Sequence, residues 1–137
     1  MKAYVDRNAQ RIYHILQQTV AIRRRIEGLA KDDFLSDIDK TEATLYGLTV
    51  IGEAVRAMDD DFKASHTDVP WQSIIGLRNF IVHEYDGVDY DIVWNVISHD
   101  LPELTPKLVE IYKAFEFPDD FVPPPSPTEE DNLKPQN

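Results

Sequence analysis

Cysteine is absent from this chain of 137 residues, which excludes a disulfide scaffold and a zinc site built on thiolates. Apolar runs long enough to cross a membrane are missing too. The opening residues 1–7 lack the apolar core of a signal peptide, and no glycine-rich phosphate-binding loop occurs. By elimination, we expect a soluble, cytoplasmic protein.

Positive charge is scarce as well, because 14 basic residues face 25 acidic ones for a net charge of −11. A nucleic-acid binder is usually basic, so this balance argues against RNA unless the arginines gather locally. Residues 118–137 contain five acids and one lysine, which gives this segment a net charge of −4. The remaining body therefore still carries a net charge of −7. The alternatives are arginines scattered over solvated helices and a basic cleft built from Arg7, Arg11, Arg23, Arg24, Arg25, Arg56 and Arg78.

The apolar residues recur with the period of helices, and their 42% share suffices for one domain with a core. A first long amphipathic helix is predicted by a stripe at alternating steps of three and four: Ile12, Ile15, Thr19, Ile22, Ile26 and Leu29. After a break at Asp32 and Asp33, a second stripe predicts a helix over residues 38–58. Gly52 inside it permits the close approach of another helix.

Residues 59–69 are polar and predict a loop, after which Asp68 caps a third helix with Pro70 in its first turn. This helix is expected to fray over residues 82–85, because the turn signal Asp86-Gly87 follows.

A fourth helix is expected to begin around Asp89, and a further segment to be capped by Asp100 and bent or restarted at Pro106. No convincing strand alternation occurs. We therefore predict an all-α fold, an antiparallel four- to five-helix bundle over residues 1–117. Residues 118–137, with six prolines and five acids, are predicted to be a disordered acidic, proline-rich tail.

The most informative segment, Arg-Asn-Phe-Ile-Val-His-Glu-Tyr, places Arg78, Asn79, His83 and Tyr85 within eight residues. Arginine presents a planar fork of donors that matches phosphate oxygens, and histidine exchanges protons near neutral pH. The segment therefore indicates cutting or binding of a phosphodiester. The alternative is an arginine in a surface salt bridge and a histidine that favours the negative end of a helix dipole.

The pattern RNxxxHxY lies between Val69-Pro70-Trp71 and the downstream segments Ile92-Val93-Trp94 and Asp100-Leu101-Pro102. In this context it resembles the HepT-type HEPN proteins, small prokaryotic ribonuclease toxins of two-gene, type VII toxin–antitoxin modules. The likeness runs from Val5 to Phe117. It implies a HEPN-like bundle, an RNA substrate, a homodimer or higher oligomer, and a minimal nucleotidyltransferase antitoxin as partner.

Five residues separate Arg78 from His83, so on an ideal helix the two side chains point about 140° apart. They converge if the helix unwinds before His83, or if two chains share one cleft across a two-fold axis. The HEPN proteins, which this chain resembles, take the second route. Asn79 and His83, at a spacing of four, share a helix face.

The chemistry that fits these residues is metal-independent RNA cleavage by attack of the ribose 2′-hydroxyl on the adjacent phosphorus. His83 is the expected general acid or base, and Arg78 the group that stabilises charge on the phosphorane. Asn79 is expected to orient the histidine or to hold a phosphate oxygen. The product would end in a 2′,3′-cyclic phosphate, and DNA should resist because it lacks the nucleophile.

Tyr85 stands two residues beyond the histidine. The resemblance implies that a partner nucleotidyltransferase adenylylates this tyrosine and so silences the toxin, because added phosphate opposes the binding of RNA phosphates. The alternative is a half-buried ring that packs under Trp94.

Metal and cofactor sites have little support in the sequence. His14, His66 and His99 share no ligand spacing, and the run Asp59-Asp60-Asp61 is more typical of a solvated face. Two further functions remain open. One is a non-catalytic HEPN module that binds a nucleotide or a nucleotidyltransferase, and the other is a plain helical interaction protein.

Overall fold

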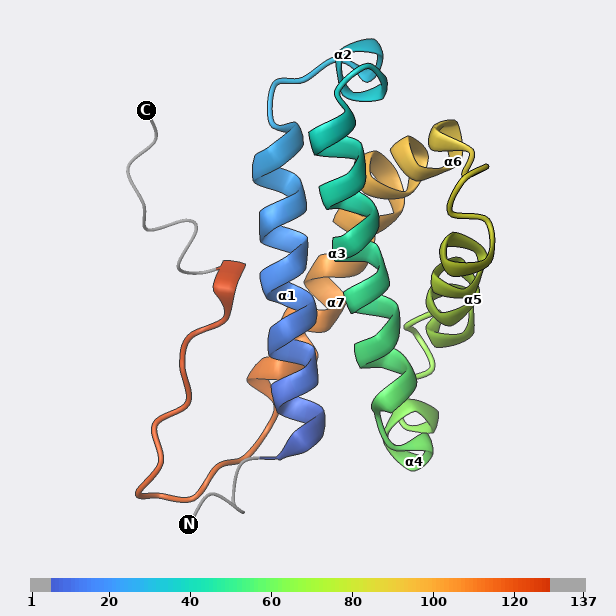
Figure 1. Ribbon diagram of the computed structural model, residues 1–137. Helices are drawn as coiled ribbons and strands as arrows, with labels where there is room; N and C mark the ends of the chain where they lie inside the picture. Colours follow the sequence, from blue (N-terminus) through green and yellow to red (C-terminus); the bar gives the residue numbers. More distant parts are fainter. Residues whose placement is uncertain (1–5, 129–137) are drawn as a thin grey trace.

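The computed structural model describes residues 6–128, and within this range every regular element is a helix. Four long stretches build the body (Figure 1), and short helices lie at its two ends. The elements are α1 (Arg7–Ile26), α2 (Lys31–Leu35), α3 (Ile38–Ala57), α4 (Asp60–Ala64), α5 (Trp71–His83), α6 (Tyr90–Asn95), the π-helical segment η1 (Val96–Asp100) and α7 (Leu101–Lys113). The predicted all-α bundle is confirmed.

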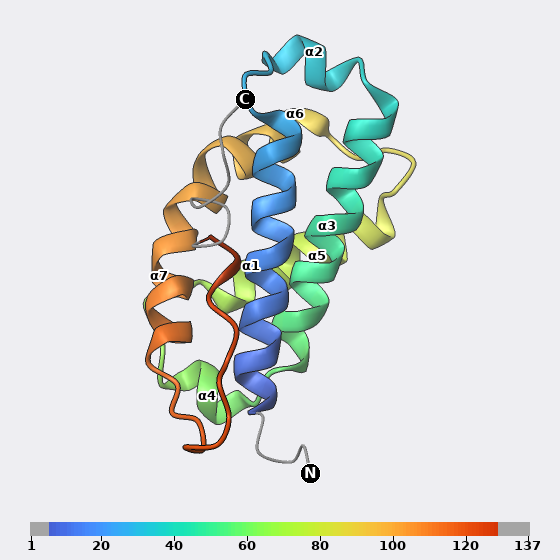
Figure 2. The same ribbon diagram turned by 90° about the vertical axis from the view of Figure 1, so that its left-hand side faces the viewer.

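The long helices alternate in direction, and α3 lies between α1 and α5 while α7 packs on the other side of α1 (Figures 1 and 2). The stripe predicted for the first helix faces inward: Ile12, Ile15, Thr19 and Ile22 are buried. Thr19 is satisfied there because its hydroxyl donates to the carbonyl of Ile15 at 2.9 Å. Within residues 6–128, no helix is long and apolar enough to cross a membrane.

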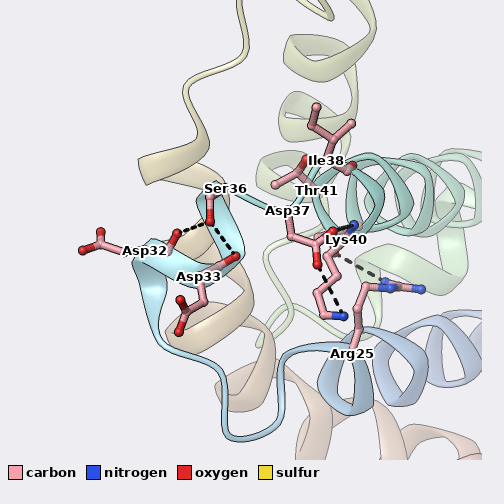
Figure 3. A network of polar contacts seen from close by, with 9 residues as sticks. Arg25, Asp32, Asp33, Ser36, Asp37, Ile38, Lys40 and Thr41 are labelled. Carbon is pink, nitrogen blue, oxygen red and sulfur yellow. Dashed lines mark hydrogen bonds and ion pairs between the residues drawn. The ribbon is translucent and has the colours of Figure 1, made fainter.

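The connection between α1 and α3 differs from the predicted break. The chain turns at Gly28, whose φ of 71° favours glycine, and Asp32 and Asp33 then lie in the first turn of α2. The corner is closed by side chains (Figure 3): Ser36 donates to the Asp32 carbonyl at 2.9 Å, and the Asp37 carboxylate caps α3 by accepting from the Lys40 amide at 3.1 Å.

The segment before α5 is not a plain loop, because residues 60–64 form α4. The predicted Asp68 cap is wrong: Pro70 is the N-cap residue and no side chain caps the helix. Trp71 anchors this end instead, since its ring is buried and its indole N–H donates to the carbonyls of Lys63 and His66, each at 3.0 Å.

The fourth helix begins where it was predicted, with the Asp89 carboxylate accepting from the Asp91 amide at 2.9 Å. Asp100 does not cap a new helix, because its backbone is helical and η1 joins α6 to α7 without a break. Pro106 lies inside α7 and does not restart it.

Residues 118–128 are the described part of the tail that was predicted to be disordered. This segment is extended and returns alongside α1 (Figures 1 and 2). The Tyr112 hydroxyl donates to the Pro124 carbonyl at 2.8 Å, and Ser126 is buried. Residues 129–137, which complete the tail predicted to be disordered, lie outside the described residues.

Candidate active site

Helix α5 carries the motif, and it remains helical up to His83. The amide of the next residue, Glu84, still bonds to the Phe80 carbonyl at 3.0 Å, and the Gly87 amide then closes a turn onto the Glu84 carbonyl at 2.8 Å. The predicted end of the helix within residues 82–85 is confirmed. Unwinding before His83, one of the two routes by which arginine and histidine could meet, does not occur.

Arg78 lies in the seam between α5 and α3, with only 19% of its side chain exposed. Its guanidinium forms an ion pair through Nη2 with Glu53 Oε1, and Nη1 donates to Asn79 Oδ1 at 2.9 Å. Nε is buried, and no hydrogen-bond partner for it occurs within residues 6–128. Two neighbours therefore fix the guanidinium, while some of its donors remain unused.

Gly52 makes this position possible. A Cβ added there would lie 2.2 Å from Arg78 Cβ and 2.7 Å from its Cγ, distances at which atoms clash. The close helix approach predicted for Gly52 is confirmed, and the approaching residue is Arg78 itself.

Glu53 is a site residue that the motif did not reveal. It follows Gly52, and a half-exposed carboxylate beside a point of close helix contact is well placed to pair with a cation on the neighbouring helix. Its signal in the sequence is the dipeptide Gly52-Glu53, which becomes informative only once the partner helix is known.

His83 is exposed at the last residue of α5. Within residues 6–128, no hydrogen bond joins His83 to Arg78 or Asn79. Asn79 faces Arg78 rather than His83, which favours a role in holding the arginine. One chain thus joins Arg78 to Asn79 and Glu53, and neither interaction includes His83.

Tyr85 is 75% exposed, directly after the end of α5. Trp94 instead packs on Phe34, with ring centroids 5.3 Å apart. The alternative of a half-buried Tyr85 ring under Trp94 is therefore wrong, and the phenol is accessible to another protein.

Side chains suited to metal binding do not gather: among residues 6–128, no group of three or more His, Asp or Glu could hold an ion. His14 is exposed on α1, the His66 ring packs at a tilt against Phe62 with ring centroids 4.8 Å apart, and His99 contacts Ser98 through Nδ1 at 3.1 Å. These histidines lie on different elements and do not join the motif.

Comparison with known proteins identifies relatives over most of the chain. A protein named "Putative RNase" from Caldanaerobacter subterraneus subsp. tengcongensis is 40% identical over 98 residues, which covers 72% of this chain and 88% of the relative. The "Probable ribonuclease HepT" of Thermococcus cleftensis is 34% identical over 82 residues, covering 60% of this chain and 74% of the relative. No solved structure gives a significant match.

The family model described as "Ribonuclease HepT-like" matches residues 15–111, a range that contains α3, α5 and the whole motif. Together with the relative that is 40% identical and the all-helical bundle, this match establishes that the chain belongs to the HepT-like ribonuclease family.

Proposed function

We propose that this protein is a metal-independent endoribonuclease. The observation that carries the proposal is a guanidinium held by Glu53 and Asn79 with unused donors, on the same short helix as an exposed histidine. The family match and the relatives named as ribonucleases support RNA as the substrate.

In the proposed reaction, the 2′-oxygen of a ribose attacks the adjacent phosphorus and the bond from phosphorus to the 5′-oxygen breaks. A base accepts the 2′-hydroxyl proton, and an acid donates a proton to the leaving 5′-oxygen. His83 supplies one of these transfers, and Arg78 stabilises the negative charge of the phosphorane. Asn79 and Glu53 keep the guanidinium oriented before substrate arrives.

Arg78 and His83 diverge on α5, and a dimer would bring an arginine and a histidine to the same cleft. We propose that two copies face each other across the exposed edge of α3 and α5, so that the His83 of each copy lies near the shared cleft. Each of these helices has an exposed apolar side chain in the single chain, Tyr46 of α3 at 68% and Val82 of α5 at 41%. Val82 is one turn beyond Arg78, which places this apolar surface beside the site.

We further propose that Tyr85 is the point of control, adenylylated by a cognate nucleotidyltransferase antitoxin of a type VII module. The exposed phenol supports this, because a transferase must reach the hydroxyl. The added phosphate would place negative charge two residues from His83, where RNA phosphates must bind.

The test is incubation of the purified protein with a mixed RNA pool in the presence of EDTA, with His83→Ala and Arg78→Ala as variants and DNA of the same sequence as control. Cleavage of RNA by the wild type alone, leaving cyclic-phosphate ends, is expected. Equal inertness of wild type and variants would direct attention to Tyr85, whose modification the intact mass of the same sample reveals. An unmodified and inactive protein would overturn the ribonuclease proposal.

The second candidate is a non-catalytic module that binds a nucleotide or a nucleotidyltransferase. One observation favours it: within one chain, the Arg78 guanidinium is already engaged by Glu53 and Asn79. This function predicts that His83→Ala leaves every measurable activity unchanged while partner binding persists.

A further inference from the structure

Helix α1 concentrates positive charge in an acidic protein. It contains five of the chain's 14 basic residues and none of its 25 acidic ones. Arg7, Arg11, His14, Gln18 and Arg25 recur at steps of three, four and seven, so they form one stripe along the helix. We call these five residues the polar stripe.

The polar stripe borders α3. Arg25 Nη1 donates to Thr44 Oγ1 of α3 at 3.4 Å, and Gln18 Oε1 lies 3.1 Å from the place that a Cβ on Gly47 would take. Between the two helices, a groove of about 520 Å³ is open to solvent. Its polar lining comprises Arg11, His14, Gln17 and Gln18 from α1 and Thr49 and Glu53 from α3. We call it the α1/α3 groove.

Arg11 has no ion-pair or hydrogen-bond partner within the part of the chain that the structure describes, although acidic residues outnumber basic ones. Glu53 is the carboxylate that lines the groove, and it is engaged by Arg78. The unpaired guanidinium of a half-buried arginine, in a groove whose acid is already neutralised, is suited to an anion.

The groove is continuous with the candidate active site, because Glu53 belongs to both. From Arg11 to Gln18 the stripe extends about 10 Å along the helix axis. A surface of this length can contact a short run of nucleotides. It is too short for a duplex, because a protein that binds double-stranded RNA contacts successive grooves of a wide helix. The glutamine amides can both donate to and accept from base edges, and the exposed His14 ring offers a stacking surface.

We propose that the α1/α3 groove is the strand-binding subsite of the enzyme, which guides single-stranded RNA toward Arg78. In it, Arg11 binds a backbone phosphate, and Gln17 and Gln18 contact bases. This inference rests on the proposed ribonuclease function and deepens it. It also explains how a protein with a net charge of −11 binds RNA: one helix supplies the contact surface.

The test measures binding separately from cleavage. Binding of a fluorescein-labelled single-stranded RNA of mixed sequence is followed by fluorescence anisotropy in the His83→Ala background, where the strand stays intact. Adding Arg11→Gln should raise Kd about five- to tenfold and reduce the slope of log K against log salt by about 0.7, as expected for one lost phosphate contact to a single strand. Arg11→Lys, which keeps the charge, should retain the slope.

Gln17→Ala should change the preference among base sequences and leave the salt slope unaltered, because it removes no charge. Lys107→Gln is the matched control: it removes one positive charge from α7, where the side chain donates to the Asp68 carbonyl outside the groove. Its Kd should stay within about twofold of the background. Far-ultraviolet circular dichroism verifies that each variant is folded.

Two outcomes overturn the inference: equal effects of Arg11→Gln and Lys107→Gln, or duplex RNA that binds as tightly as the single strand. If the otherwise wild-type protein still cleaves RNA in either case, the proposed function stands and only the groove assignment fails. If Arg11→Gln weakens binding while wild-type protein with unmodified Tyr85 does not cleave, the groove assignment stands and the catalytic proposal fails.

Discussion

Gly52→Ala is the sharpest test of the seam that holds Arg78. The new methyl group would lie 2.2 Å from Arg78 Cβ, an atom fixed to the backbone that no change of rotamer can move away. Helices α3 and α5 must therefore separate. Separation would also draw Arg78 away from Glu53, so that stability and RNA cleavage should fall together.

The expected change in the free energy of unfolding is the sum of two opposing contributions. Overpacking a well-filled contact costs about 1–3 kcal/mol, whereas replacing glycine by alanine in a helix gains about 1 kcal/mol. Gly76 on α5 shows the gain from alanine alone, because a Cβ added there meets nothing within 4 Å. Gly76→Ala should stabilise the protein by about 0.5–1 kcal/mol, and the two variants should differ by about 1–3 kcal/mol.

The assay is urea unfolding followed by circular dichroism, at one protein concentration for all variants because self-association would shift the apparent stability. RNA cleavage is measured on the same samples. Equal stability of the two alanine variants, or a Gly52→Ala protein with full stability and activity, would refute the close-packed seam.

Three further changes probe single contacts. Glu53→Gln removes the charge that orients Arg78 but keeps an acceptor, so cleavage at saturating RNA should slow about tenfold while urea unfolding changes by no more than about 1 kcal/mol; unchanged cleavage would contradict the positioning role. Tyr112→Phe removes the bond to the Pro124 carbonyl and should cost about 0.5–1.5 kcal/mol in the same unfolding assay, whereas no loss would detach residues 118–128 from the fold. Asp6→Ala removes the cap on the Asn8 and Ala9 amides and should cost about 1 kcal/mol, with Asp6→Asn as the control that keeps it.

The two short helices show why part of the fold escaped prediction. Acidic pairs at residues 32–33 and 60–61 read as a break and a loop, yet they occupy the first turns of α2 and α4. Acidic residues are favourable there because they face the positive end of the helix dipole. Five residues are too few to display a helical period. The acidic residues therefore led to the prediction of non-helical segments, although Phe34 and Phe62 lie in them.

The sequence of residues 118–128 does not show which surface this segment meets. A segment rich in proline and acidic residues has little apolar surface to bury by itself, so its composition predicts disorder. In the structure, the segment meets the body through the Tyr112 hydroxyl and buries Ser126, and no local pattern encodes these contacts.

The sequence by itself determined the helical class, the long amphipathic helices and the end of α5, and it singled out the residues proposed for phosphodiester chemistry, because these depend on periodicity and residue type along one segment. Only the tertiary structure decided what those residues meet. Arg78 pairs with a carboxylate 25 positions earlier because glycine lets two helices touch, Tyr85 is left exposed, and Arg11 lies in a groove shared with Glu53. Contacts between distant segments depend on how helix faces pack, which the spacing within any one helix does not specify.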